Sequence, residues 1–295
     1  MSINRRDFLK TLGVAGTSLS GVSALARSKQ PAEDGEFYAI LHDATLCEGC
    51  QECEFACAAA NGLPTPSDDD YPDTEIVRKL NTDRYTVVNA HETSVGEVYV
   101  KQQCRHCAQP ACASACLTAA MKKHEEGPIT WDGDKCMGCR FCMLSCPFDM
   151  PKFEYGSNNP EIVKCQMCFS KIKEGELPAC VENCPAEALY FGKRSDVIKE
   201  AHRRILEEPD LYVDHVYGEF EAGGTSWLNL SPAPFEELGF KTDIDDKPYP
   251  ELTKGFLYSV PSVFVLWPAL LLGLRQATGG EARKVEEEVF EEVKS

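Results

Sequence analysis

The chain has 295 residues, of which 16 are cysteine, and its formal net charge is −17 at pH 7. This acidic chain has no concentrated basic patch, so nucleic-acid binding is excluded, because phosphate recognition needs a positive footprint. With the terminal segments described below set aside, residues 35–254 remain, enough for one compact body or two small modules.

The N-terminus has the pattern of an export signal. Arg5 and Arg6 precede Phe8, a mildly apolar stretch covers residues 11–25, and Ala26 closes an A-x-A cleavage-like site. The arrangement over residues 1–26 resembles a twin-arginine signal, although Asn4 stands where Ser or Thr is usual. The alternative is an ordinary signal with two chance arginines. Twin-arginine export carries folded proteins, which suits a chain that acquires its cofactors in the cytoplasm.

All 16 cysteines fall into four quartets, and each quartet ends in a CxxxC step. The quartets are Cys47, Cys50, Cys53 and Cys57; Cys104, Cys107, Cys112 and Cys116; Cys136, Cys139, Cys142 and Cys146; and Cys165, Cys168, Cys180 and Cys184. The first and third repeat the CxxCxxCxxxC run of bacterial ferredoxins, in which the fourth thiolate binds a second cluster. At four thiolates per cluster, the chain is predicted to bind four [4Fe-4S] clusters and to carry single electrons.

Two other uses of the cysteines are alternatives to clusters. A disulfide framework is possible in an exported chain, but neighbouring thiols on one short loop converge on a common centre and not on separate partners. Structural zinc is the better rival, although zinc sites usually pair two distant CxxC hooks. The spacing favours iron–sulfur clusters over both.

The quartets are nested along the chain. The second and third are close in sequence and can form one two-cluster module, so the first and fourth are expected to pair around it. The exchange rule of two-cluster ferredoxins then predicts four ligand sets. These are Cys47, Cys50, Cys53 and Cys184; Cys57, Cys165, Cys168 and Cys180; Cys104, Cys107, Cys112 and Cys146; and Cys116, Cys136, Cys139 and Cys142.

Short strands are predicted to flank the quartets, with a short helix after each CxxxC step. The strands are expected at residues 37–42, 98–101, 129–132 and 188–192, and residues 63–97 are expected to form an inserted hairpin region. The fold class is therefore α+β, with tandem or nested two-cluster ferredoxin-like modules in a domain over residues 35–200. A helix is expected at 195–206, and residues 201–254 are expected to form a membrane-proximal extension, irregular from 212 onward.

Near the C-terminus, residues 256–274 form an uncharged run of 19 residues. A helix of that length approaches the ~30 Å thickness of the hydrocarbon layer. A single transmembrane anchor is predicted over residues 255–276, with Pro261 and Pro268 tolerated inside it. A buried or re-entrant helix is the alternative. The export signal places the clusters in the periplasm and the tail, residues 277–295, in the cytoplasm.

No catalytic machinery is evident in the sequence. CxxCH, GxGxxG and P-loop motifs are missing, and the six histidines have no metal-binding spacing. Gly49 and Gly138 suit a close backbone approach to clusters. Four basic residues beside ligands are candidates for raising cluster potentials, with a solvent-facing role as the alternative for each. They are Arg105, His106, Arg140 and Lys164.

The quartet order and the segments 135–148 and 178–185 resemble the four-cluster electron-transfer subunits of molybdopterin oxidoreductases and membrane-bound hydrogenases. Residues 216–231 resemble the segment before the anchor in the formate dehydrogenase β subunit and in the hydrogenase-2 ferredoxin subunit. A chain that has both its own signal and its own anchor looks more like the ferredoxin subunit of hydrogenase-2, or like the similar subunit of a multihaem transmembrane redox complex. Leu117 and Ala58 depart from the family pattern, which commonly has Pro after the second quartet.

The resemblance implies a non-catalytic relay. Its partners would be an integral membrane quinone-reactive subunit and a periplasmic hydrogenase, molybdopterin enzyme or multihaem cytochrome. The β subunit of a molybdopterin oxidoreductase such as formate dehydrogenase, and a structural metal-binding scaffold without a redox task, are the alternative functions.

Overall fold

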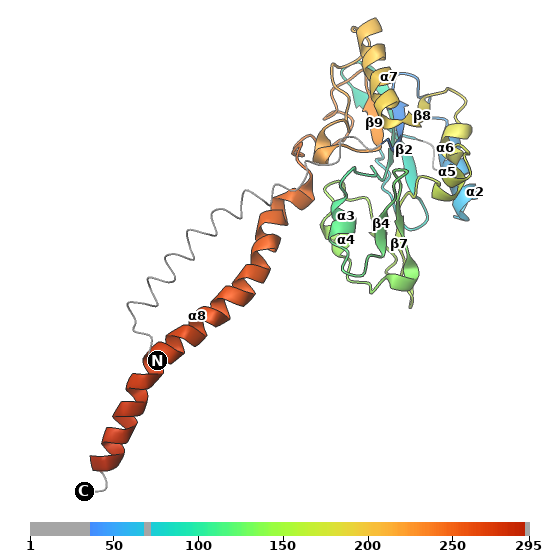
Figure 1. Cartoon of the computed structure of the whole chain (residues 1–295). Coiled ribbons are helices and arrows are strands. Elements are labelled where there is room, and N and C mark those ends of the chain that lie inside the picture. The colour runs from blue at the N-terminus through green and yellow to red at the C-terminus, as the bar shows by residue number, and fades with distance from the viewer. Residues whose placement is uncertain (1–35, 68–71, 293–295) are drawn as a thin grey trace. The chain divides into compact units, whose positions relative to one another are not determined.

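The computed structural model describes residues 36–67 and 72–292 (Figure 1). The twin-arginine signal predicted at residues 1–26 lies outside the described residues. Chain contacts separate a body, which ends at Leu252, from the C-terminal segment that begins at Thr253. Each is described by itself below.

A three-stranded sheet runs through the body. Its strands are β1 (Tyr38–Asp43), β8 (Leu189–Lys193) and β9 (Trp227–Leu230), in the order β8-β1-β9. Strand β1 pairs antiparallel with β8 and parallel with β9. The predicted strands at 37–42 and 188–192 are therefore present within one residue of their expected bounds.

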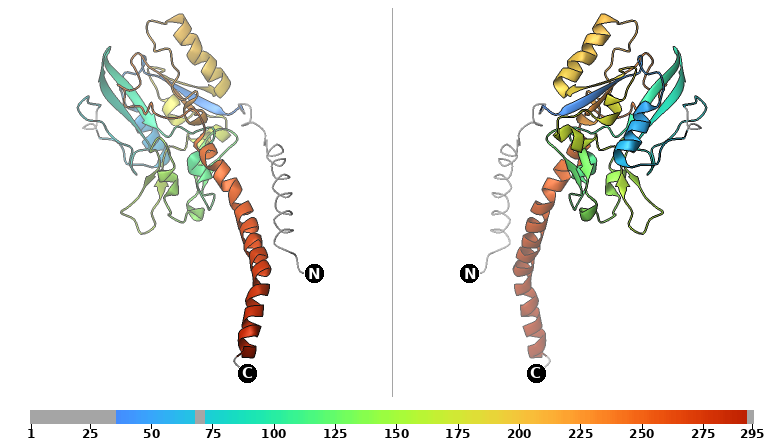
Figure 2. Two further views of the ribbon diagram at one scale, coloured as in Figure 1. Left: turned by 90° about the vertical axis from the view of Figure 1, so that its left-hand side faces the viewer. Right: turned by 90° about the vertical axis from the view of Figure 1, so that its right-hand side faces the viewer.

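The two faces of this sheet pack against different layers, because successive side chains of a strand point to opposite sides. Ala39 and Leu41 join a buried cluster with Val197 and Ala201 of α7 (Arg194–Glu207). Figure 2 shows α7 lying over this face. Ile40, on the other face, packs in a cluster that contains cysteines of the first and fourth quartets. The sheet thus separates the α7 layer from the layer of the thiols.

Three two-stranded hairpins complete the strands. They are β2 (Thr86–Thr93) with β3 (Gly96–Gln103), β4 (Met121–Lys123) with β5 (Ile129–Trp131), and β6 (Lys152–Phe153) with β7 (Ile162–Val163). The inserted hairpin expected within residues 63–97 is the first of these, and it continues to the residue before Cys104. The expected strand at 129–132 is β5.

The sequence predicts short helices after the CxxxC steps, but in the structure each helix begins one residue before the first cysteine of its step. They are α2 (Glu52–Asn61), α3 (Ala111–Ser114), α4 (Phe141–Leu144) and α6 (Ala179–Glu182). One helical turn between two cysteines four residues apart brings both side chains to the same side of the helix. A further helix, α5 (Phe169–Lys173), begins directly after Cys168.

The segment after α7 belongs to the body of the protein. The helix predicted at 195–206 is α7, but residues 212–254, predicted to be irregular, contribute strand β9 to the central sheet and a 3-10 turn at Glu221–Gly223. Aromatic rings of this segment also form a core, in which Tyr217, Phe235 and Phe240 lie within 5.2 Å of one another between centroids. A strand buried on both faces has no alternation to reveal it in the sequence.

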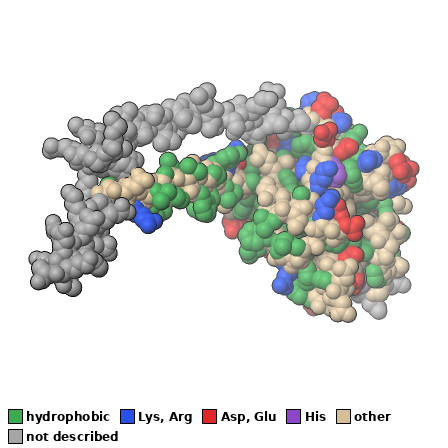
Figure 3. Space-filling view, turned by 60° about the horizontal axis from the view of Figure 1, so that its bottom comes forward, with side chains coloured by type: hydrophobic (Ala, Val, Ile, Leu, Met, Phe, Trp, Pro, Cys, Tyr) green, Lys and Arg blue, Asp and Glu red, His purple; other side chains and the backbone are tan. Residues whose placement is uncertain are grey.

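The C-terminal segment is one helix, α8 (Tyr249–Glu292). It contains the whole of the predicted anchor, including Pro261 and Pro268, and continues into the predicted tail. Residues Tyr249–Thr278 are long and apolar enough to cross a membrane. Figure 3 shows apolar side chains covering the described part of this helix, and Phe264 and Val265 are about 70% exposed.

Candidate metal-cluster sites

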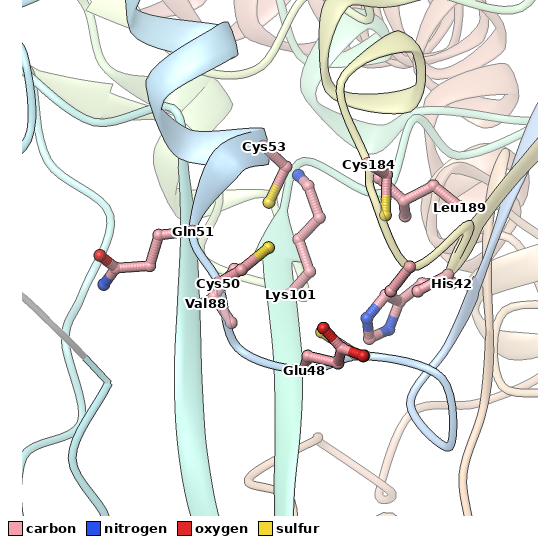
Figure 4. Close-up of a pocket in the computed structure, with 12 residues that line it drawn as sticks. His42, Glu48, Cys50, Gln51, Cys53, Val88, Lys101, Cys184 and Leu189 are labelled. Atoms are coloured by element: carbon pink, nitrogen blue, oxygen red, sulfur yellow. The ribbon is translucent and has the colours of Figure 1, made fainter.

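Thiol set 1 lies at the start of α2. Its cysteines, Cys47, Cys50, Cys53 and Cys184, line a single pocket, and three of their sulfurs are seen converging in Figure 4. The first three come from the loop after β1 and from α2, and Cys184 comes from the loop after α6. These are the residues that the exchange prediction groups together.

Thiol set 2 lies on the other side of Lys101. Cys57, Cys165, Cys168 and Cys180 line a second pocket together with Lys101 and Trp227. Cys57 is the last cysteine of the first quartet, whereas the other three belong to the fourth. The first and fourth quartets are therefore interleaved, and we call thiol sets 1 and 2, which lie against the central sheet, the sheet half.

Thiol sets 3 and 4 combine the second and third quartets in the same way. Burial raises the pKa of Cys107, and the charges of Cys146, Cys104 and Cys112 raise it further, so these four thiols are neighbours and form set 3. Burial likewise raises the pKa of Cys142 to about 11, with contributions from Cys116, Cys136 and Cys139, which complete set 4. We call sets 3 and 4 the hairpin half, because side chains of β4–β7 pack against thiols of both sets, namely Cys112, Cys116, Cys136 and Cys142.

Contacts link neighbouring sets. Lys101 lines the pockets of both set 1 and set 2, and Cys112 of set 3 packs in one buried cluster with Cys142 of set 4. Between the halves, Lys164 Nζ donates to the carbonyls of Cys165 and Ile129, and Ile129 packs in the cluster of Cys112. These contacts agree with the order set 1, set 2, set 3, set 4.

Each quartet begins with the same backbone turn. The second residue after the first cysteine has a left-handed φ in all four, at Gly49 (70°), His106 (49°), Gly138 (70°) and Met167 (56°). Such turns point successive backbone N–H groups into one concavity, which suits negatively charged sulfur. The amide of Met167 donates to Cys165 Sγ at 3.3 Å, and that of Gly138 donates to Cys136 Sγ at 3.5 Å.

The two glycines in these turns are required for different reasons. At Gly49 an added Cβ would lie 2.4 Å from the ring of Tyr99, so the turn packs closely against β3. At Gly138 an added Cβ would have no neighbour within 4 Å, and only the left-handed φ favours glycine. The close contact at Gly49 is with Tyr99, so the expected close approach of both glycines to clusters stays a prediction.

The departure from the family pattern at Leu117 leaves the backbone turn after the second quartet unchanged. The third residue after the last cysteine has a left-handed φ at Ala119 (54°), Asp149 (53°) and Glu187 (50°), so the loop with Leu117 has the same turn as the two loops that contain Pro. After the first quartet the chain differs, because α2 continues past Ala58 to Asn61. There Asn61 donates to the carbonyl of Cys57 at 2.8 Å.

Most of the thiols are held in conditions that favour the protonated form. Burial raises the pKa of Cys57 to about 12 and that of Cys47 to about 11. Cys116 is different, since burial acts to raise its pKa but hydrogen bonds from Met121 and Thr118 outweigh it and lower the pKa. Binding iron displaces the thiol protons, so metal binding and deprotonation are coupled at these sites.

Of the four basic residues singled out in the sequence, three are buried and one is not. Arg105 lies over the rings of Tyr217 (5.2 Å) and Phe240 (4.7 Å), and Lys164 Nζ donates to the carbonyls of Ile129 and Cys165. His106 accepts from the amide of Ile129, and burial lowers its pKa well below the usual value, so the ring is neutral. Arg140 is exposed and lies over Phe153 at 5.1 Å.

The sequence does not single out two charged or titratable residues that line the pockets of the sheet half. Lys101 lines both of its pockets, and His42 lines the first. Burial and the charge of Lys101 lower the pKa of His42 to about 3, so its ring is neutral. Lys101 lies on β3 between Val100 and Gln102, where strict alternation places it with Tyr99 and Gln103, on the face opposite Val98 and Val100.

Exposure differs along the series. Cys139 of set 4 is exposed, whereas the other 15 cysteines are buried or half-buried. Large apolar side chains around it are also exposed, with Leu144 at 80% and Phe141 at 54%. Set 4 is therefore the set closest to solvent.

The donor chemistry fits iron–sulfur clusters. Each set consists of four thiols and no other ligand, and all-thiolate sites bind zinc or iron–sulfur clusters. Among the described residues, no three histidine, cysteine, aspartate or glutamate side chains converge closely enough to hold a single metal ion. Four thiols spread around a common space are the arrangement that a cluster needs.

Comparison with known proteins leads to the same chemistry. Residues 95–194, which include the second, third and fourth quartets, match the model of the 4Fe-4S dicluster domain. A protein of Nitratidesulfovibrio vulgaris Hildenborough is 45% identical over 99% of this chain and 81% of its own length. The hydrogenase-2 operon protein HybA of Escherichia coli O157:H7 is 33% identical over 92% of this chain and 94% of its own. The formate dehydrogenase-O iron-sulfur subunit of Escherichia coli K12 is 28% identical over 70% of each chain.

Proposed function

The chain belongs to the family of ferredoxin-type iron–sulfur subunits that includes HybA, and on this premise we propose that it relays single electrons through four [4Fe-4S] clusters. It is an electron-transfer subunit of an oxidoreductase complex and catalyses no reaction alone. The observation that carries the proposal is the grouping of 16 cysteines into four all-thiol sets, each built from two quartets.

The proposed ligands follow the exchange prediction. Thiol sets 1 to 4 would each hold one cluster, with the last cysteine of every quartet serving the partner quartet's site. The pockets of sets 1 and 2 and the neighbouring thiols of sets 3 and 4 support this assignment. When bound, the clusters would supply reversible one-electron chemistry.

The chain's own residues prepare these sites for electron transfer. Left-handed turns point backbone amides at the thiolates, which stabilises negative charge on sulfur. Ile40, Trp227 and Leu189 cover the sheet half and exclude water from it. The series arrangement of the sets places each site beside the next, so the chain provides one path with two ends.

The exposed end is proposed to meet a redox partner. Cys139 and the apolar side chains around it bring set 4 to the surface, where a cofactor of another subunit can come closest. The exposed aromatic and aliphatic side chains there, Phe141 and Leu144, lie next to the exposed Arg140 and suit a subunit of a stable complex. The partner classes are a periplasmic hydrogenase, molybdopterin enzyme or multihaem cytochrome on one side of the relay and a membrane quinone-reactive subunit on the other.

The location is part of the proposal. Helix α8 would anchor the chain once in the cytoplasmic membrane, and the twin-arginine pattern at residues 1–26 would place the body in the periplasm. Residues 201–254, which lead into α8 and include its first residues, would then form the part of the body nearest the membrane. Protease treatment of intact spheroplasts tests the orientation: digestion of the body supports it, and full protection overturns it.

Metal analysis of the full chain in detergent tests the function. About 16 iron atoms and as many acid-labile sulfides per chain are expected, because four [4Fe-4S] clusters each bring four of both. On reduction, EPR signals of interacting clusters should appear. Zinc in place of iron would contradict the relay and favour a structural scaffold.

A further inference from the structure

Lys101 is a buried cation between the two thiol sets of the sheet half. Its side chain is 2% exposed and lines both the pocket of set 1 and that of set 2. Figure 4 shows it reaching from β3 toward Cys53, with the ammonium nitrogen at the thiol end of the pocket. Both cluster sites of this half therefore face the same positive charge.

The direct partners of this ammonium group are neutral. Lys101 Nζ donates to Thr86 Oγ1 and to Gln103 Oε1, the latter at 3.2 Å, and lies 4.8 Å from the centroid of the Trp227 ring. Among the described carboxylates none forms an ion pair with Lys101, and the buried Glu54 is paired with Arg78. A buried ammonium without a carboxylate is costly, so negative charge must come from elsewhere.

The thiols are the available source of that charge. Burial acts to lower the pKa of Lys101, but the charges of nearby thiolates more than offset it and the pKa is raised. In return, Lys101 acts to lower the pKa of thiols in both sets of the sheet half. These are Cys47, Cys53, Cys57, Cys165 and Cys180.

We propose that Lys101 is the shared counter-charge of the two clusters in the sheet half and raises the reduction potential of both. The inference rests on the proposed function, because it presumes a cluster in sets 1 and 2. When one electron enters either site, the site becomes more negative by one charge, and a fixed ammonium nearby stabilises that reduced state more than the oxidised one. No proton is taken up, and Lys101 stays charged throughout.

The hairpin half has buried cations of its own, but they are placed differently. Lys164 Nζ donates to the carbonyls of Ile129 and Cys165, and Arg105 lies over the rings of Tyr217 and Phe240. Lys101 differs from both because it lines the pockets of two thiol sets at once. Its effect is therefore expected on both clusters of the sheet half.

A redox titration of the full chain, followed by EPR, tests the inference. In Lys101→Met, two of the four one-electron midpoints are expected to become more negative by at least about 59 mV, which is a tenfold change in the ratio of reduced to oxidised cluster. Lys101→Arg, which keeps the charge, should leave them near the wild-type values. The matched control is Lys122→Met, an exposed lysine on β4 that should move none of them.

Iron content separates the possible outcomes. Full iron with unchanged midpoints in Lys101→Met overturns the inference but leaves the relay function intact, whereas a wild-type chain without iron overturns the relay itself. If both Lys101→Met and Lys101→Gln lose about half of the iron while Lys101→Arg retains it, the counter-charge role is supported, because only charge distinguishes them. Loss of iron from Lys101→Arg as well would overturn it in favour of a purely steric role.

Discussion

The sheet half and the hairpin half hold thiol sets of the same composition in different surroundings. Sets 1 and 2 lie under a three-stranded sheet that is covered by α7, and they share the buried Lys101. Sets 3 and 4 lie among short hairpins, and set 4 reaches the surface at Cys139. Equal ligands in unequal environments are expected to give clusters of unequal potential, since burial, charge and solvent exposure all tune them.

The largest effect is expected from removing a ligand. Cys184→Ala should abolish the same cluster as Cys47→Ala, and each variant should lose about four of roughly 16 iron atoms. The reason is that both thiols line the pocket of set 1 although they come from different quartets. Iron analysis and EPR of each variant check this.

Cys57→Ala provides the control for the exchange between quartets. It should abolish the cluster of set 2, so its EPR spectrum should differ from that of Cys47→Ala and match that of Cys165→Ala. Matching spectra for Cys57→Ala and Cys47→Ala would mean that each quartet binds its own cluster, and the interleaving of the sheet half would be wrong.

The next largest effect is expected on folding stability, from removing one salt bridge in each half. In the sheet half, Arg78 Nη2 lies 2.6 Å from Glu54 Oε1, and the Glu54 side chain is 1% exposed. Arg78→Met leaves that carboxylate buried and unpaired, which should cost about 3–5 kcal/mol of folding free energy. The shift of the denaturant midpoint, with cluster absorbance as the probe, measures it.

An exposed pair in the hairpin half is the matched comparison. Lys241 Nζ lies 2.8 Å from Asp149 Oδ2 in the loop after Cys146, and both side chains are well exposed. Lys241→Met should therefore cost less than about 1 kcal/mol, since water screens the pair. Equal midpoint shifts for the two variants would remove this difference between the halves.

A smaller effect is expected at the exposed end of the relay. Leu144→Asp places a charge in the apolar rim near Cys139 and should slow electron exchange with the partner about tenfold, which corresponds to about 1.4 kcal/mol at a contact surface. Stopped-flow reduction of the purified complex measures the rate. Leu206→Asp, at an equally exposed position (80%) on α7, should leave the rate unchanged. Equal slowing by both would indicate a general charge effect.

The smallest effect is expected on α7, away from the thiols. Arg203 and Arg204 bond to Glu200 and lower its pKa from the usual 4.5 to about 2. Because the folded-state pKa is the lower one, the stabilisation is complete above pH 4.5 and is lost as the pH falls toward 2. Glu200→Gln should therefore lower stability by less than about 1 kcal/mol, by an equal amount from pH 8 to pH 5.

Denaturant midpoints of wild type and Glu200→Gln across that pH range check the prediction. The clusters remain a common feature of both proteins, so the difference reports on α7 alone. A difference that already vanishes near pH 6 would mean that Glu200 is not held ionised by its arginines.

Much of the fold was predictable where local rules decide it. The strands β1, β5 and β8, the helix α7 and the hairpin β2–β3 all follow from alternation and turn residues close in sequence. The short helices predicted after the CxxxC steps begin one residue before those steps instead. Strand β9 was missed, since its burial on both faces depends on β1, almost 190 residues earlier in the chain.

The sequence by itself determined which thiols fall into quartets and how the quartets can pair, because thiol spacing within a quartet is local and nesting follows from chain order. Only the tertiary structure decided the surroundings of each set. The serial order, the exposure of Cys139 and the position of Lys101 between two pockets all depend on segments far apart in sequence packing together. Charge and burial act through space, so the environment of each site became visible only in the fold.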